Sequence, residues 1–111
     1  MQKIKLSEAI RIGAAKRPQT YFSFFRKEAN GLCSCALGAA YEGVNLSLPV
    51  ENERGDIKVS DANYSLFINM FPFLLSLEEQ GAKLFRRITY RNDELKWTRE
   101  QIADWLESEG F

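Results

Sequence analysis

The stretch Cys35-Ala36-Leu37-Gly38-Ala39-Ala40-Tyr41-Glu42-Gly43-Val44 decides the fold of this 111-residue chain. Its residues Leu37, Ala40, Tyr41 and Val44 are spaced i, i+3, i+4, i+7, which is the stripe of a helix that faces a core. Most of the others are small, so a second backbone can approach this helix closely. We expect a central, tightly packed helix here. The alternative is that the space beside the small residues forms the floor of a ligand site.

The segments before this helix predict another helix and a hairpin. Ser7 is a favourable N-cap for a helix over 8–17. Thr20–Arg26 is rich in residues that favour strands. Asn30-Gly31 marks a tight turn, so a short strand over Leu32–Ser34 is expected to return beside the first strand.

The segments that follow predict a second hairpin and a further helix. Leu46–Val50 and Ile57–Val59 can pair as two short strands. Either Ser60 or Asp61 can cap the next helix, which Pro72 interrupts because proline disrupts a helix interior.

Two capping boxes mark the helices of the C-terminal third. Ser76-Leu77-Glu78-Glu79 opens a helix that is expected to run to about Tyr90, before Asn92-Asp93 breaks it. Thr98-Arg99-Glu100-Gln101 opens the last helix, which ends at Gly110. Together the elements predict one compact α+β domain over residues 1–111, with four to five helices packed around a small antiparallel hairpin or sheet.

The composition is that of an ordinary soluble globular domain, with 45% hydrophobic residues, 27% charged residues and a net charge of zero. Charge is unevenly spread, because residues 1–45 carry seven basic and three acidic side chains and residues 46–111 carry eight and twelve. The two halves can pair within the fold, or the asymmetry can orient two copies or steer a partner. Without histidine the chain lacks the commonest general acid–base group, so we expect no catalytic residues, cofactor or metal.

Nucleic acid and membranes are not expected partners. The last helix carries four acidic residues against Arg99 alone, and such a helix would be repelled by phosphates. The most apolar segment, residues 68–77, is shorter than the about 20 residues that span a bilayer. The N-terminus lacks the apolar run of a signal peptide, and two cysteines are few for a secreted disulfide domain, so we expect a cytoplasmic protein.

The two cysteines, Cys33 and Cys35, precede the central helix and are candidate reactive thiols. The positive end of a helix can lower the pKa of a thiol. Cysteine hydrolases pair the thiol with histidine, which is absent, so a redox sensor or another thiol enzyme is the third functional hypothesis. The simpler interpretation is that both cysteines are small buried hydrophobic residues.

A dense basic cluster and an adjacent polar segment form the candidate binding site. The cluster consists of Lys83, Arg86, Arg87 and Arg91, which recur at helical spacing and could bind an anionic partner. The cluster could equally be a solvated helix face. Next to it, Asn92, Asp93 and Trp97 could line a binding surface.

Three blocks of the sequence resemble small bacterial and phage proteins that carry the same blocks in this order. The blocks are Leu6-Ser7-Glu8-Ala9-Ile10-Arg11, Cys35-Ala36-Leu37-Gly38-Ala39-Ala40, and Asn92-Asp93 followed by Trp97-Thr98-Arg99-Glu100-Gln101-Ile102-Ala103-Asp104-Trp105. The resemblance implies a compact domain of mixed α and β character and a phage or mobile-element setting. It implies no activity.

These observations lead to three functional hypotheses. The first is a non-catalytic interaction or regulatory module that binds a host protein or pairs with itself. The second is a protein that binds a small anionic, nucleotide-like ligand with the small-residue helix and the basic cluster. The third is the thiol-based sensor or enzyme. A basic cluster beside a concave site would favour the ligand, whereas a flat apolar surface would favour the interaction module.

Overall fold

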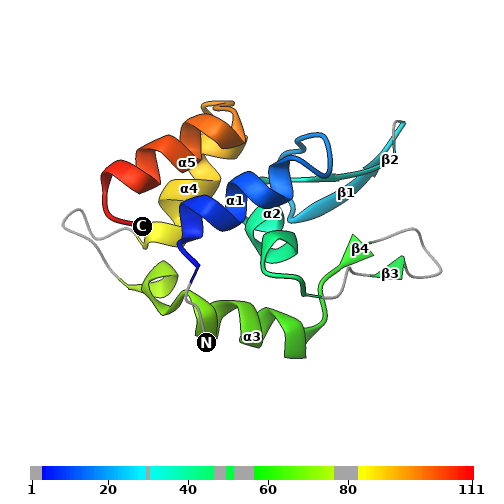
Figure 1. Cartoon of the computed structure of the whole chain (residues 1–111). Coiled ribbons are helices and arrows are strands. Elements are labelled where there is room, and N and C mark those ends of the chain that lie inside the picture. The colour runs from blue at the N-terminus through cyan, green and yellow to red at the C-terminus, as the bar shows by residue number, and fades with distance from the viewer. Residues whose placement is uncertain (1–3, 30, 47–49, 52–56, 77–82) are drawn as a thin grey trace.

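Helix α2 (Ala36–Gly43) lies at the centre of the molecule, and all of its residues are buried. The computed structural model describes residues 4–29, 31–46, 50–51, 57–76 and 83–111. Within these ranges the chain is a single small α+β domain of five α-helices, one 3-10 helix and two two-stranded antiparallel sheets (Figure 1). The expected fold class is confirmed.

Neighbouring backbone fills the space beside the small residues of α2. Helix α1 (Leu6–Ala14) packs along one side of α2, and the loop before the first hairpin packs on another. A Cβ atom added to any of three glycines would overlap a carbonyl oxygen, in the pairs Gly13 with Ala39, Gly43 with Ala9 and Gly38 with Phe24. The packing prediction is therefore confirmed, and this space lends no support to a ligand floor.

Helix α1 begins earlier than expected, so the prediction of Ser7 as its N-cap is wrong. Ser7 lies inside the first turn, and its hydroxyl is buried without a hydrogen-bond partner in the described part of the chain. The Ser7 N–H instead donates to the carbonyl oxygen of Phe111, at 3.2 Å. The Phe111 carbonyl, which is distant in sequence, thus accepts a hydrogen bond from a helix N–H group that was expected to bind a local capping side chain.

The expected end of α1 at residue 17 is also wrong, because the helix stops at Ala14. The buried guanidinium of Arg99 donates to the carbonyl oxygens of Ala14 and Arg17, at 3.4 and 2.6 Å, and to the Ser34 hydroxyl at 2.9 Å. Carbonyl groups that the shorter helix leaves free are therefore satisfied by a cation from the last helix. Burial lowers the pKa of Arg99.

The first hairpin pairs β1 (Phe25–Glu28) with β2 (Gly31–Ser34), with Glu28 opposite Gly31. The expected returning strand is confirmed, although Asn30 of the turn lies outside the described residues. Gly31 has a φ of 105°, which favours glycine.

The predicted strand over Thr20–Arg26 is wrong for most of its length. Thr20–Phe24 is a loop, because Phe22 has a φ of 68° and interrupts any extended run. The loop is anchored at both ends: Thr20 N–H donates to the Ser34 carbonyl at 2.9 Å, and the Phe24 carbonyl accepts from Cys35 N–H at 3.0 Å.

The second hairpin forms, with its first strand shifted from the expected position, and the following helix forms as expected. The expected strand Leu46–Val50 overlaps the observed strand only at Val50, and residues 47–49 lie outside the described ranges. Strands β3 (Val50–Glu51) and β4 (Ile57–Lys58) pair antiparallel, and the residues between them lie outside the described ranges. Helix α3 (Asp61–Met70) has Ser60 as its N-cap, whose Oγ accepts from the Asn63 N–H at 3.1 Å.

Pro72 ends the α3 segment as the sequence predicts. It opens the 3-10 helix η1 (Pro72–Leu75), where its missing N–H costs nothing. In Figure 1, α3 runs along the lower edge of the molecule.

Helix α4 (Leu84–Asp93) begins and ends later than its sequence suggests. Lys83 is extended immediately before it, so the expected start after Ser76 is wrong. The remaining residues of that proposed capping box, 77–79, lie outside the described part of the chain. The helix also continues through Asn92-Asp93 instead of breaking there.

Helix α5 (Arg99–Ser108) opens with the predicted capping box. The Thr98 hydroxyl accepts from the Gln101 N–H at 3.1 Å, and the Gln101 side chain accepts from the Thr98 N–H at 2.8 Å. Both partners lie within four residues of each other, so local sequence suffices to specify this helix start.

The core between the helices is aromatic as well as aliphatic. Tyr41, Phe67 and Phe71 are among its largest fully or almost fully buried side chains, and their rings contact in sequence at centroid distances of 6.0 and 5.5 Å. Phe111 stacks on Phe73 at 4.6 Å and so attaches the end of the chain to this cluster. Across the described ranges, no helix is both long and apolar enough to cross a membrane.

Candidate functional site

The structure divides the predicted basic cluster between different faces of α4. The guanidinium of Arg91 lies 3.8 Å from the ring centroid of Trp105 and 5.2 Å from that of Trp97, and that of Arg87 lies 5.1 Å from Trp105. Burial, followed by the charge of Arg87, lowers the pKa of Arg91. These two arginines and Trp97 therefore belong to the contact between α4 and α5.

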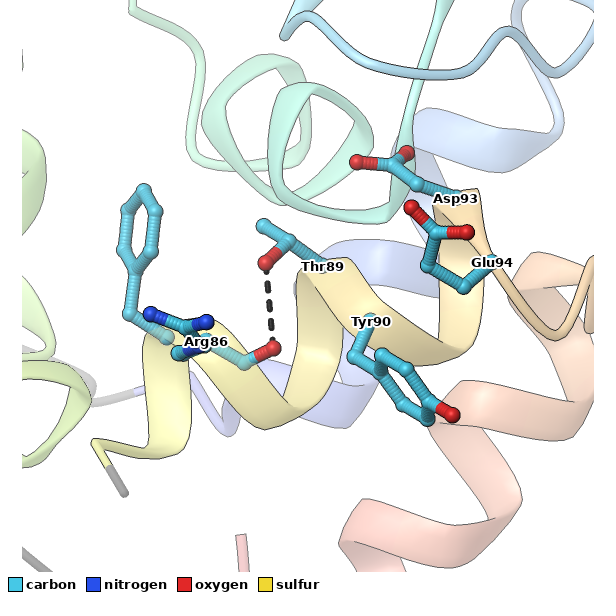
Figure 2. A pocket seen from close by; sticks show the side chains of 6 residues that line it. Arg86, Thr89, Tyr90, Asp93 and Glu94 are labelled. Atoms are coloured by element: carbon cyan, nitrogen blue, oxygen red, sulfur yellow. Dashed lines mark hydrogen bonds between the residues drawn. The ribbon is translucent and has the colours of Figure 1, made fainter.

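Arg86 lies on another face of α4, in a surface hollow of about 430 Å³. The lining residues all come from this helix and the residue that follows it, and are Phe85, Arg86, Thr89, Tyr90, Asp93 and Glu94 (Figure 2). The lining thus combines one cation with two carboxylates. Lys83, the fourth member of the predicted cluster, is exposed at the start of α4 and does not line this hollow.

Asn92 is a buried structural residue. Its side-chain oxygen accepts from the Ala36 N–H at 3.1 Å and from the Gln19 amide at 2.9 Å. Its amide nitrogen donates to the Thr20 carbonyl at 3.0 Å and to Asp93 Oδ1 at 2.8 Å. Asn92 therefore joins α4 to the start of α2 and to the loop before β1, and these bonds engage its hydrogen-bonding capacity within the fold.

Asp93 connects the α4 hollow to an exposed aromatic residue. Its Oδ1 accepts from the backbone N–H of Phe22 at 2.8 Å. Phe22 is 63% exposed, the largest exposed fraction among the large hydrophobic side chains of the described chain. The predicted site residue Asp93 therefore holds the backbone from which an exposed ring projects.

Phe22 and Lys96, whose side chains lie next to each other, both occupy the left-handed backbone region. Their φ values are 68° and 56°. The Lys96 ammonium lies 4.7 Å from the ring centroid of Phe22 and 3.9 Å from that of Tyr21. A bulky residue in this region costs about 1–3 kcal/mol, and such residues persist only where the surrounding contacts impose them.

We define the Phe22 surface as the surface formed by four residues: Phe22, Tyr90, Asp93 and Lys96. Tyr90 is 52% exposed and lines the same hollow as Asp93. Of the four, only Asp93 was a candidate from the sequence. Phe22 was missed because no glycine or asparagine marks its left-handed turn, and Tyr90 because it was assigned only to the end of a helix.

The thiols of Cys33 and Cys35 are both buried and are free cysteines. Cys35 is the N-cap of α2, and its sulfur accepts from the Gly38 N–H at 3.4 Å. Burial nevertheless raises the pKa of Cys35 to about 11, against the opposing effect of the helix N–H groups. Burial, reinforced by Glu28, also raises the pKa of Cys33. Burial therefore outweighs the helix end, and the burial of both side chains agrees with the simpler interpretation that they are small core residues.

Within the described residues, Cys, Asp and Glu side chains form no group of three that could hold a metal ion. The predicted site residues thus separate into a cation–π contact, a buried hydrogen-bonding centre and an exposed surface around Phe22. No protein-family model, curated protein or solved structure matches this chain.

Proposed function

We propose that this protein is a non-catalytic interaction module that binds a partner protein through the Phe22 surface. The observation that carries the proposal is the exposed ring of Phe22 on a left-handed backbone. An aromatic side chain that lies largely in solvent contributes little to the core, yet its conformation costs free energy. Strained residues of this kind cluster at binding sites, where the strain serves function.

The backbone that carries the ring of Phe22 is held in place before any partner arrives. Asp93 fixes its N–H, Asn92 fixes the Thr20 carbonyl, and Cys35 N–H fixes the Phe24 carbonyl. An aromatic side chain on a fixed backbone has only two side-chain torsions to order on binding, so more of its contact energy is available as affinity.

The charges around the ring favour a protein over a small anion. Arg86 lines the same hollow as the carboxylates of Asp93 and Glu94, and Lys96 lies beside the Phe22 ring, so the region has no single sign. Aromatic residues at the centre and mixed polar groups at the rim are the usual composition of a protein interface. The anionic-ligand hypothesis is weaker, because Arg87 and Arg91 are stacked on tryptophans. The thiol hypothesis is weaker because both thiols are buried with raised pKa values.

Substitution of Phe22 by glycine tests the proposal directly. Phe22→Gly removes the ring, keeps the N–H that binds Asp93, and accepts the left-handed backbone without strain. We expect the free energy of unfolding to stay unchanged or rise by up to about 1 kcal/mol. We expect partner affinity to fall by roughly 30-fold or more, as for a central aromatic contact.

The partner can be found and the effect measured with one matched control. Wild type, Phe22→Gly and Ile12→Ser are immobilised and exposed to bacterial lysate, since the resemblance implies a phage or mobile-element setting. Ile12 is also an exposed apolar residue, 39% accessible, but lies on α1. The expected partner is retained by wild type and Ile12→Ser and lost with Phe22→Gly, and titration with the purified partner then gives the dissociation constants. Equal binding of all three proteins would refute the proposal.

A further inference from the structure

Beyond Asp61 at its N-terminal end, the outer side of α3 and η1 is an uncharged surface in a chain rich in charge. Residues 62–76 contain no Asp, Glu, Lys or Arg, although 27% of the whole chain is charged. On α3, the residues 62, 65, 66, 69 and 70 are all exposed and recur at the spacing of one helix face. Only Phe67 of this helix is fully buried.

Exposed apolar side chains gather along this face. Leu66 is 50% exposed, Met70 is 48% exposed one turn later, and Leu75 of η1 is 42% exposed. Asp61, at the N-terminal end of α3, is also exposed and is charged. We call the exposed uncharged residues of these two elements the α3 face, consisting of Ala62, Ser65, Leu66, Asn69, Met70, Pro72 and Leu75. Depletion of charge together with exposed Leu and Met is typical of the central part of an interface.

We propose that the α3 face binds a second copy of this chain, with two α3 helices packed antiparallel about a two-fold axis. In a two-fold interface each surface faces itself, so a charge near the axis would meet its own like charge. A surface without charge is therefore well suited to self-pairing. A different partner would more usually be selected through complementary charges, and the α3 face offers none.

The residues of the face also fit a close approach of two helices. Ala62 and Ser65 are small enough to allow helix axes about 8–10 Å apart. Asn69 lies between the apolar residues and can hydrogen-bond across the axis, as single polar residues do in paired helices. The net charge of zero adds no long-range repulsion between copies.

The size of the face limits the expected strength of the dimer. A standard interface uses roughly 20–30 residues on each side, more than the α3 face supplies. We therefore expect a dissociation constant on the order of 10–100 µM.

Sedimentation equilibrium over about 1–500 µM tests this dimer. The wild type is expected to shift from 12.8 kDa towards twice that mass as concentration rises. The double variants Leu66→Lys/Met70→Lys and Leu66→Glu/Met70→Glu place like charges across the axis, so each alone is expected to dimerise at least about tenfold more weakly. Ile12→Lys, a matched charge on α1, is expected to dimerise like the wild type.

Mixing the lysine and glutamate double variants completes the test. Opposite charges then face each other, so dimer formation is expected to return in the mixture and to weaken again in high salt. The proposal is overturned by a wild type that stays monomeric throughout, by double variants that dimerise normally, or by a mixture that fails to recover. It stands independently of the partner-binding proposal, because Phe22→Gly leaves the α3 face intact.

Discussion

At the scale of single residues, Cys35 is subject to two opposing effects. The N–H groups at the start of α2 favour a thiolate, because they point at the sulfur. Burial favours the neutral thiol, because a charge in the interior loses its hydration. Burial has the larger effect, and the pKa of Cys35 rises from 9.0 to about 11. The thiol therefore acts as a cap and a core side chain, not as a nucleophile at neutral pH.

This raised pKa predicts a loss of stability in alkaline solution. The folded protein holds the proton more tightly than the unfolded chain, so the stabilisation is complete below pH 9 and is lost as pH rises towards 11. The free energy of unfolding of wild type is expected to fall by about 2 kcal/mol relative to Cys35→Ser over this range. Serine keeps the cap and does not titrate.

Urea denaturation of the two proteins between about pH 7 and pH 10.5 measures the effect. Cys33 is present in both, so its own titration cancels in the difference. A difference in unfolding free energy that does not change with pH would show that burial does not raise the pKa of the Cys35 thiol.

At the scale of elements, the contact between α1 and α2 depends on missing side chains. Gly13 meets the Ala39 carbonyl, and Gly43 meets the Ala9 carbonyl. Alanine normally stabilises a helix interior by about 1 kcal/mol relative to glycine. Here an added methyl group would force two buried backbones apart, and the close packing of the interior opposes this.

Gly13→Ala and Gly43→Ala are each expected to lower the free energy of unfolding by about 3 kcal/mol or more, against the sign of helix propensity. Ser65→Ala, on the exposed side of α3, serves as the control and is expected to change it by less than about 0.5 kcal/mol. Chemical denaturation gives all three values. A stabilising Gly13→Ala would mean that the helices are farther apart than the structure places them.

Sequence predicted those elements whose signals are local. The α5 capping box and the Ser60 cap of α3 link residues three apart, so a short window contains both partners. The start of α1 could not be found in this way, because its Ser7 N–H is satisfied by Phe111. The Thr20–Phe24 loop was assigned as a strand because its residue types favour strands, whereas contacts with Ser34 and Asn92 determine its path.

The candidate site was harder to predict than the fold, since it depends on which face of α4 each residue occupies. Arg86 and Arg91 look equivalent in sequence, but one lines the surface hollow and the other is covered by two tryptophans. Asn92 looked like a helix breaker and is a buried hydrogen-bonding centre. Residue type alone does not distinguish these environments.

At the scale of the whole molecule, the uneven charge of the sequence is partly resolved by contact between its two halves. Arg11 of α1 contacts three carboxylates of α5, with distances of 3.1 Å to Glu100, 2.6 Å to Asp104 and 3.1 Å to Glu107. The hydrogen bond with Asp104, followed by that with Glu107, raises the pKa of Arg11. The basic first half and the acidic second half thus meet within the fold, as in the simpler of the two interpretations.

Arg11→Met is expected to lower the free energy of unfolding by about 1 kcal/mol at low salt, because three neighbouring carboxylates lose their shared cation. The carboxylates are largely exposed, and in 1 M NaCl the screening length of about 3 Å is comparable with these contact distances, so a substantial part of this loss should disappear. Urea denaturation at the two salt concentrations provides the comparison. An equal loss in both would indicate that the aliphatic part of Arg11, not its charge, holds α1 to α5.

The bond between Ser7 and Phe111 has a consequence for the order in which the protein is made. A ribosome synthesises about 5–20 residues per second, so α1 emerges roughly 5–20 s before its last partners. During that interval α1 can pair with α2, but its first turn and Arg11 still lack the contacts that α5 and Phe111 provide. Helix α1 therefore gains its full set of contacts only after residues 99–111 have been made, and until then the nascent chain offers chaperones an amphipathic segment.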